Sequence, residues 1–167
     1  MLGTGAVDQR LALNELKDTP WHKPLSHGGD GLSLAQAKDF GAGWLSSQIS
    51  DFNLNLVTVS KEVFLPSEDL RKAEARFVDI LAKHDRSSNS FLVMNFDQGK
   101  LLGHASAGHF SVLGAYDAKK HQLLVLDVDP EEISAYWVSV GAMLASILTV
   151  DCKFGCARGV LEVELRK

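Results

Sequence analysis

Three apolar runs in the second half of the chain point to its fold class: SFLVMNF at residues 90–96, HFSVLGAY at 109–116 and QLLVLDV at 122–128. Each run has the length of a strand, and the polar stretches DQGK and DAKK that separate them are typical of turns. The runs therefore predict neighbouring antiparallel strands. Successive side chains of a strand point to opposite faces of the sheet, and in these runs apolar residues occupy both odd and even positions, as in LLVL at 123–126. We therefore expect a sheet that is covered on both faces.

Helical patterns dominate the chain before these runs. Ser33 followed by Gln36 resembles a capping box, and apolar residues recur at helical spacing from Leu34 to Gly41. A second helix is predicted from Ser67 onward. Its apolar face is expected to contain Leu70, Ala73, Phe77, Ile80 and Leu81.

Weaker patterns complete the chain. Leucines among charges predict a short helix within residues 8–17, and an uncharged apolar segment predicts a helix at 139–150. Strands are predicted at 54–59 and at 159–165. With N-terminal helices packed against a C-terminal antiparallel sheet, the predicted fold class is α+β, in a single domain over residues 1–167.

The charge distribution argues against two classes of partner. Acidic side chains number 21 and basic ones 17, a net charge of -4, so the excess of cations that binds a nucleic acid backbone is missing. The first 20 residues carry charges at short intervals and lack the apolar core of an export signal. Residues 133–150 are uncharged but contain hydroxyl side chains and are flanked by acidic residues, which favours a buried helix over a membrane span. We expect a soluble protein with no nucleic acid or membrane partner.

The chain has two cysteines, Cys152 and Cys156. Two are too few for a disulfide framework or a closed zinc site, which favours a reducing compartment, and we expect a cytoplasmic location. We also expect no bound metal and no cofactor. Their spacing would let them face each other on a helical turn and bind a soft metal or form a labile disulfide. The simpler alternative is that they are buried or incidental. His22, His27 and His104 are expected to be solvated.

His109 opens one predicted strand and Asp127 closes the next. If the turn between them is centred on Ala118, antiparallel pairing places the two side chains directly opposite each other on one face, with β-carbons about 5 Å apart. A carboxylate bonded to one ring nitrogen fixes the tautomer of a histidine and leaves the other nitrogen as a general base. The pair therefore suggests two members of a catalytic triad. A His–Asp pair that only stabilises a hairpin is the structural alternative.

These residues lie in segments that resemble a known family. FLVMNF, GHFSVLGAY, LLVLDV and YWV resemble the catalytic domain of phytochelatin synthases, and GLSL at residues 31–34 resembles the start of a helix in that family. The resemblance covers residues 31–167 and implies a papain-like fold. It also implies that His109 is the catalytic histidine, that Asp127 orients it and that Trp137 follows them.

The resemblance implies the chemistry of a cysteine-dependent transpeptidase. In this family a thiolate attacks the Cys–Gly bond of glutathione, glycine leaves, and the γ-glutamylcysteinyl group passes to another glutathione or, in some relatives, to water. The implied partner is glutathione or a related γ-glutamyl peptide. A response to cadmium or zinc would arise through the metal–glutathione thiolate, with no resident metal ion.

The family's nucleophile has no cysteine counterpart before Cys152. Matching LALNEL at residues 11–16 to the family's pattern places Thr4 at the nucleophile position, where a hydroxyl is a poor substitute for a thiol. Alternatively, the nucleophile segment lies upstream of Met1. DPEE at 129–132 is acidic where the family carries basic residues; it is also compatible with a capped helical turn.

Two functional hypotheses therefore remain open. The first is an enzyme of the phytochelatin synthase type whose nucleophilic cysteine is absent from this chain. The second is a catalytically inactive papain-like relative that serves as a peptide-binding, protein-binding or regulatory module. Whether the chain is an enzyme is not decided by the sequence.

Overall fold

The computed structural model describes residues 13–48, 51–57, 67–128 and 133–166. Contacts divide the chain into two compact units, Met1–Leu32 and Ser33–Lys167, which are described separately. The first unit contains helix α2 (His22–Leu25) and a helical turn at residues 13–15, which is the described part of the helix predicted within 8–17. The single domain over residues 1–167 stays a prediction.

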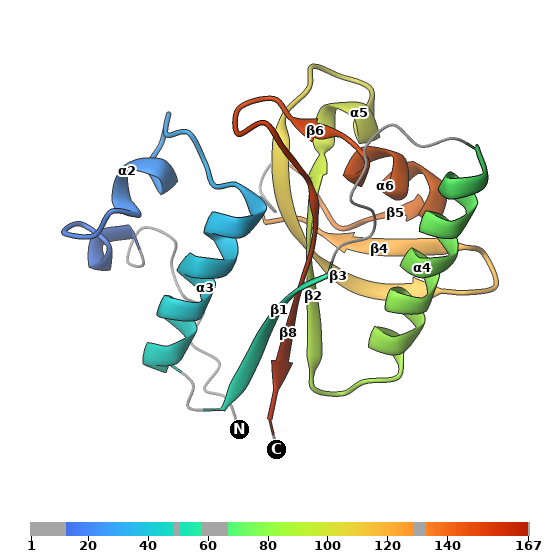
Figure 1. The fold of residues 1–167 in the computed structure, drawn as a ribbon, viewed down its shortest axis with the longest axis horizontal. Coiled ribbons are helices and arrows are strands. Elements are labelled where there is room, and N and C mark those ends of the chain that lie inside the picture. The colour runs from blue at the N-terminus through green and yellow to red at the C-terminus, as the bar shows by residue number, and fades with distance from the viewer. Residues whose placement is uncertain (1–12, 49–50, 58–66, 129–132, 167) are drawn as a thin grey trace. The chain divides into compact units, whose positions relative to one another are not determined.

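The second unit combines helices with an antiparallel sheet, which confirms the predicted α+β class (Figure 1). Its elements in chain order are α3 (Leu34–Gln48), β1 (Phe52–Val57), α4 (Ser67–Asp85), β2 (Ser90–Asp97), α5 (Gln98–Leu102), β3 (Gly108–Asp117), β4 (Gln122–Leu126), β5 (Tyr136–Ser139), α6 (Val140–Ile147), β6 (Val150–Asp151), β7 (Cys156–Ala157) and β8 (Gly159–Leu165).

The main sheet has the strand order β1–β8–β2–β3–β4–β5, and every neighbouring pair is antiparallel. The three apolar runs form β2, β3 and β4 and lie side by side, as predicted. The last strand, β8, pairs with both β1 and β2, so the C-terminal segment joins the two sides of the sheet (Figure 1). β6 and β7 form a separate hairpin.

Helices α4 and α6 cover one face of the sheet and form the core with it (Figure 1). Helix α4 contributes Ala73, Phe77 and Leu81, all buried, whereas Leu70, predicted on the same face, is 41% exposed. The remaining buried members of the core are Leu92, Met94, Phe96, Leu113, Leu123, Val125, Val140, Met143, Leu144, Ile147 and Val160. Because burying a large apolar side chain contributes about 1.5–3 kcal/mol, this face is the main source of hydrophobic stabilisation.

Helix α3 packs against β1 and β8 on the other face of the sheet (Figure 1). The predicted capping box is confirmed, since the Ser33 amide donates to Gln36 Oε1 at 2.9 Å and the Gln36 amide donates to Ser33 Oγ at 3.2 Å. The helix was predicted to end at Gly41, but it continues to Gln48. A β-carbon at Gly41 would lie 3.1 Å from the Leu54 side chain, so this glycine allows close helix–strand packing.

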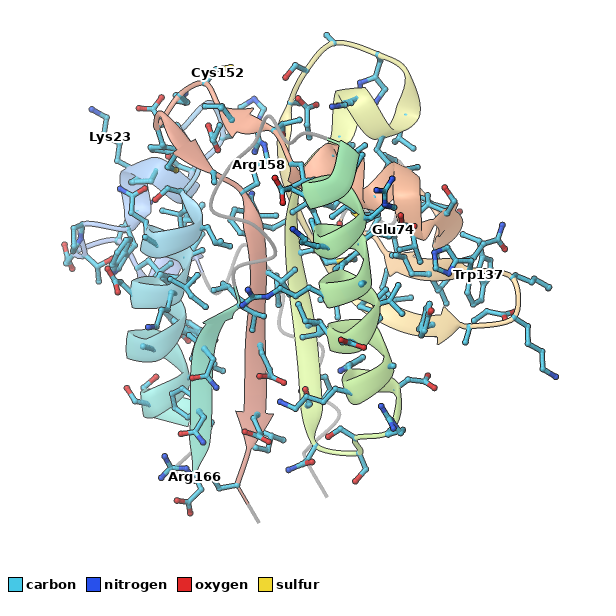
Figure 2. The ribbon with its side chains drawn as sticks, turned by 45° about the vertical axis from the view of Figure 1, so that its right-hand side comes forward. Lys23, Glu74, Trp137, Cys152, Arg158 and Arg166 are labelled. Carbon is cyan, nitrogen blue, oxygen red and sulfur yellow. The ribbon has the colours of Figure 1, made fainter. Side chains whose placement is uncertain are left out.

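The face opposite the α4–α6 core is only partly covered along β2, β4 and β5. Phe91 is 45% exposed, Leu126 is 41% exposed and Trp137 is 50% exposed. Figure 2 shows Trp137 at the end of the sheet away from α3. The prediction of a sheet covered on both faces therefore fails in this region, because apolar residues also make up much of an ordinary protein surface.

The register of β3 and β4 differs from the predicted one. Asp117 pairs with Gln122, so the turn is centred beyond Ala118. A β-bulge at Gly114 then shifts the pairing by one residue. The net difference from the predicted register is an even number of residues, and an even shift leaves every side chain on the face where the prediction placed it.

Candidate functional site

His109 and Asp127 meet at one end of β3 and β4. His109 is the second residue of β3, and Asp127 directly follows β4. The Nε2 atom of His109 lies 3.0 Å from Oδ1 of Asp127, which confirms the predicted hydrogen bond. The carboxylate side chain is 0% exposed and the imidazole is 19% exposed, so solvent reaches the pair through the histidine.

The two residues are nevertheless not directly opposite each other. Extending the β3–β4 register by one residue beyond its last pair places Ser111, and not His109, opposite Asp127. The prediction of direct pairing is therefore wrong by two residues, because the turn is centred beyond Ala118 and the bulge at Gly114 offsets only part of that displacement. Since side chains alternate along a strand with a period of two, His109 still lies on the same face as Asp127.

The contact through Nε2 determines which ring nitrogen is available for chemistry. A neutral imidazole that donates its Nε2–H to a carboxylate carries its lone pair on Nδ1. Within the part of the chain that the structure describes, Nδ1 of His109 has no hydrogen-bond partner. The arrangement can therefore take up a proton at Nδ1, and the buried carboxylate stabilises the imidazolium that results.

Two side chains of β2 hold His109 in place. Phe96 pairs with His109 across the strands, and their ring centroids lie 5.6 Å apart at an interplanar angle of 77°. The neighbouring Asn95 is buried, and its Nδ2 donates to the backbone oxygen of His109 at 3.3 Å. A histidine that is packed and hydrogen-bonded in this way is restricted to few orientations.

Asp97 fixes the segment that leads into His109. Its Oδ1 accepts the Lys100 amide at 2.9 Å at the start of α5, and its Oδ2 accepts the Ser106 hydroxyl at 2.5 Å. Burial raises the pKa of Asp97, but hydrogen bonds from Ser106 and from backbone amides, together with the charge of Arg158, outweigh burial and lower the pKa. The DQGK stretch is thus part of a capped helix and not the simple turn that we predicted.

Arg158 forms a buried ion pair close to this segment (Figure 2). Its Nη1 donates to Asp151 Oδ2 at 3.2 Å and its Nε donates to Thr149 Oγ1 at 3.0 Å. The arginine and aspartate side chains are 3% and 10% exposed. A β-carbon at Gly108 would lie 2.8 Å from Arg158 Nη1, so the absence of a side chain next to His109 makes room for the guanidinium.

Two hydroxyl-bearing residues beside Asp127 were not identified from the sequence. Ser111 is completely buried and its Oγ donates to Asp127 Oδ2 at 3.4 Å. Tyr136 lies near the same carboxylate; burial and the negative charge of Asp127 raise the pKa of Tyr136 to about 12. Ser111 could have been found, because it follows His109 by two positions on the same strand. Tyr136 could not, because its position depends on the pairing of β5 with β4.

The remaining predicted candidates do not join this site in the described structure. Thr4 and the acidic stretch 129–132 lie outside the described residues. Cys156 pairs with Asp151 in the β6–β7 hairpin, and Cys152 lies at its exposed turn (Figure 2). The predicted helical turn is therefore wrong, since the segment pairs as strands. Both thiols are free.

The described ranges contain neither a metal-binding cluster nor a membrane-spanning helix. No group of three or more His, Cys, Asp or Glu side chains there is arranged to hold a metal ion. None of the helices in these ranges has the length and apolar character needed to cross a bilayer. The segment 133–150 instead contains β5 and α6.

Comparisons with known proteins point to the same family. The sequence profile described as "Phytochelatin synthase" matches residues 48–160, which include His109 and Asp127. A glutathione gamma-glutamylcysteinyltransferase of Schizosaccharomyces pombe is 32% identical over 76 residues, which cover 46% of this chain and 18% of the relative. Glutathione gamma-glutamylcysteinyltransferase 1 of Arabidopsis thaliana is 26% identical over 85 residues, which cover 51% of this chain and 17% of the relative. The matched region is therefore less than a fifth of either relative.

Proposed function

This chain belongs to the phytochelatin synthase family, and on that premise we propose that it acts on glutathione or a related γ-glutamyl peptide. The proposed reaction transfers the γ-glutamylcysteinyl group to a second peptide or to water and releases glycine. The two relatives carry the name of this transferase activity. Because the chain matches only a small part of each, its activity and its substrate are both part of the proposal.

His109 is proposed to move the protons of this reaction through Nδ1. It accepts the proton of the attacking thiol, and the sulfur adds to the carbonyl carbon of the Cys–Gly bond. Nδ1–H then protonates the departing amine of glycine, which leaves the γ-glutamylcysteinyl group on the sulfur as a thioester. In the second half, His109 accepts a proton from the attacking amine or water and returns it to the sulfur as the thioester breaks.

Asp127 is proposed to orient this imidazole and to stabilise its charged form. The observation that carries the proposal is the 3.0 Å contact between a completely buried carboxylate and an imidazole that is 19% exposed. A pair that only stabilised a hairpin would not need to leave one ring nitrogen available. The combination matches the needs of proton transfer at a site that a peptide can reach.

The thiolate is proposed to come from a cysteine outside the 167 residues. Both cysteines of the chain lie in the β6–β7 hairpin, whereas Thr4 is the residue that the family pattern aligns with the nucleophile. Cadmium or zinc would enter with the substrate, as a metal–glutathione thiolate. Because the chemistry requires reduced thiols, we propose a cytoplasmic location.

Glutathione binding tests the substrate class without requiring a nucleophile. We expect the imidazole NMR signals of His109 in isotope-labelled protein to shift and saturate as glutathione is added to about 10 mM, a range that detects weak complexes. His121 is the internal control, because it is 48% exposed and paired with Glu74 on a different part of the fold. A titration in which His109 does not respond would contradict the proposed substrate.

Glycine release tests the chemistry. Thr4→Cys places a thiol at the aligned position, and wild type is the matched control without it. If Thr4 occupies the nucleophile position, T4C should release glycine from glutathione, and T4C/H109A and T4C/D127N should lose at least about a hundredfold of that rate. If the nucleophile comes from outside the 167 residues, T4C should stay as inactive as wild type. If neither binding nor release is observed, the inactive peptide- or protein-binding relative is the better description.

A further inference from the structure

Tyr136 lies beside Asp127 but takes no part in the reaction proposed above. It belongs to β5 and pairs with Val125 of β4, so its side chain shares a face with Val125 and with Asp127 two positions further along. Its ring packs against the core. Its hydroxyl oxygen is a buried side-chain atom that has no hydrogen-bond partner within the described residues.

Burying a hydroxyl without a hydrogen-bond partner costs free energy, so a compensating role for this group is expected. The ionisable group that influences this hydroxyl is Asp127. Burial and the negative charge of the nearby Asp127 carboxylate raise the pKa of Tyr136 to about 12. The β4–β5 register places Tyr136 diagonal to Asp127 on the same face of the sheet, where long side chains can meet. At neutral pH the hydroxyl keeps its proton and can act only as a neutral donor toward the carboxylate.

A further hydrogen-bond donor would help to stabilise the buried carboxylate of Asp127. Its Oδ1 is bonded to His109 at 3.0 Å, and its Oδ2 accepts from Ser111 at 3.4 Å, which is long for a hydroxyl donor. The carboxylate is 0% exposed. Each donor that reaches a buried carboxylate stabilises its charged form and limits its rotation.

We propose that Tyr136 is a positioning residue, which donates its hydroxyl hydrogen to Asp127 and holds the carboxylate so that Oδ1 faces Nε2 of His109. The chemical meaning of this inference rests on the proposed function. By keeping the proton of His109 on Nε2, Tyr136 keeps Nδ1 as the nitrogen that serves as the base. If Tyr136 had only a packing role, replacing it with phenylalanine would leave the tautomer of His109 unchanged.

The first test reads the tautomer of His109 by nitrogen-15 NMR at neutral pH in wild type, Tyr136→Phe and Tyr116→Phe. Tyr116 is the matched control, because it is the other of the two tyrosines and packs against the same core. We expect Y136F to populate the Nδ1–H tautomer and to speed exchange of the Nε2–H proton about three- to tenfold. Y116F should match wild type. A Y136F spectrum identical to wild type, or an equal change in Y116F, would overturn the proposal.

The second test measures the coupling from the tyrosine side. In a Y116F background Tyr136 is the remaining tyrosine, and its ionisation is followed by phenolate absorbance while circular dichroism confirms that the sheet persists. Adding Asp127→Asn should lower the midpoint by about one pH unit or more, toward the ordinary value of about 10. An unchanged midpoint in the folded protein would show that Asp127 does not contact the hydroxyl. If the chain unfolds before Tyr136 ionises, the tautomer measurement decides.

Both measurements are made without glutathione, so they separate this inference from the proposed function. A tautomer change in Y136F together with no glutathione binding would retain the positioning role and reject the substrate. Glutathione binding at His109 together with an unchanged Y136F tautomer would do the opposite.

Discussion

Oδ1 of Asp127 reaches Nε2 of His109 at 3.0 Å from a position diagonal to it on the neighbouring strand. Diagonal neighbours on a sheet face are about 7–8 Å apart, so only side chains of some length meet across this distance. The place directly opposite Asp127 is left to the shorter Ser111, which bonds the second carboxylate oxygen. The diagonal arrangement thus gives each oxygen of the buried carboxylate its own donor.

Replacing Asp127 tests how much its hydrogen bonds with His109 and Ser111 contribute to the stability of the fold. Asp127→Ala leaves His109 and Ser111 without their acceptor in a buried place, so the free energy of unfolding should fall by about 1–3 kcal/mol. Asp127→Asn keeps the size and one oxygen acceptor and should lose less. Urea unfolding of both variants measures the difference, and equal stability of D127A and wild type would show that the contacts do not contribute.

Asp97 should make stability depend on pH in the acid range. Its pKa is lowered in the folded protein, so the folded state favours the carboxylate. The stabilisation is complete above the unfolded-state pKa of about 3.9 and is lost as the pH falls through the lower folded-state value.

The measurement is urea unfolding of wild type and Asp97→Asn over a series of pH values. The advantage of wild type should be constant well above pH ~4 and shrink below it. Ser106→Ala removes a donor to the carboxylate and should reduce the pH-dependent part of that advantage. An advantage that stays constant to the lowest pH at which the protein folds would contradict this assignment.

Gly99 and Gly141 should respond to alanine in opposite ways, although both lie in helices. A β-carbon at Gly99 would overlap the backbone carbonyl of Ala105, in the segment that leads into β3, and backbone atoms cannot move aside easily. We expect Gly99→Ala to destabilise the protein by more than about 2 kcal/mol.

Gly141 is the control for this change. A β-carbon there would meet nothing within 4 Å, so Gly141→Ala in α6 should be neutral or should stabilise the protein by up to about 1 kcal/mol. Thermal unfolding of both variants distinguishes them, and equal effects would rule out the close packing at Gly99.

Phe77 and Phe91 test which face of the sheet carries the core. Phe77 is 0% exposed and packs between α4 and the sheet, whereas Phe91 is 45% exposed on the opposite face. Phe77→Ala should cost about 3–5 kcal/mol and Phe91→Ala less than half as much. A larger loss for F91A in chemical unfolding would show that the opposite face is covered in solution.

Arg158 and Asp151 should be strongly coupled. Arg158→Met leaves the Asp151 carboxylate buried without its cation and should reduce the free energy of unfolding by about 3–5 kcal/mol. The double variant Arg158→Met/Asp151→Leu should recover part of this loss. The exposed pair Lys72–Asp69 is the comparison, because breaking it should cost about 1 kcal/mol or less. Additive effects of R158M and D151L would contradict the coupling.

Much of the secondary structure could be predicted because it depends on residues that are close in the chain. Short apolar runs separated by turn residues indicated β2, β3 and β4, and the Ser33–Gln36 pair indicated the start of α3. The end of α3 could not be read in the same way. Gly41 is typical of a helix end, but here it is needed for contact with Leu54, a residue of another element.

For the site, the prediction that His109 and Asp127 share one face held because the displaced turn and the bulge at Gly114 together shift the register by two residues, and an even shift preserves the face. Which residue lies opposite which was set by the bulge at Gly114 and by the position of the β3–β4 turn. These depend on how strands fit against their neighbours and the core. The arrival of Tyr136 beside Asp127 likewise required the pairing of β5 with β4. Local pattern therefore specifies the elements and the alternation of side chains along each one. Register and long-range neighbours come from packing of the whole sheet, because their energies are shared among residues far apart in the chain.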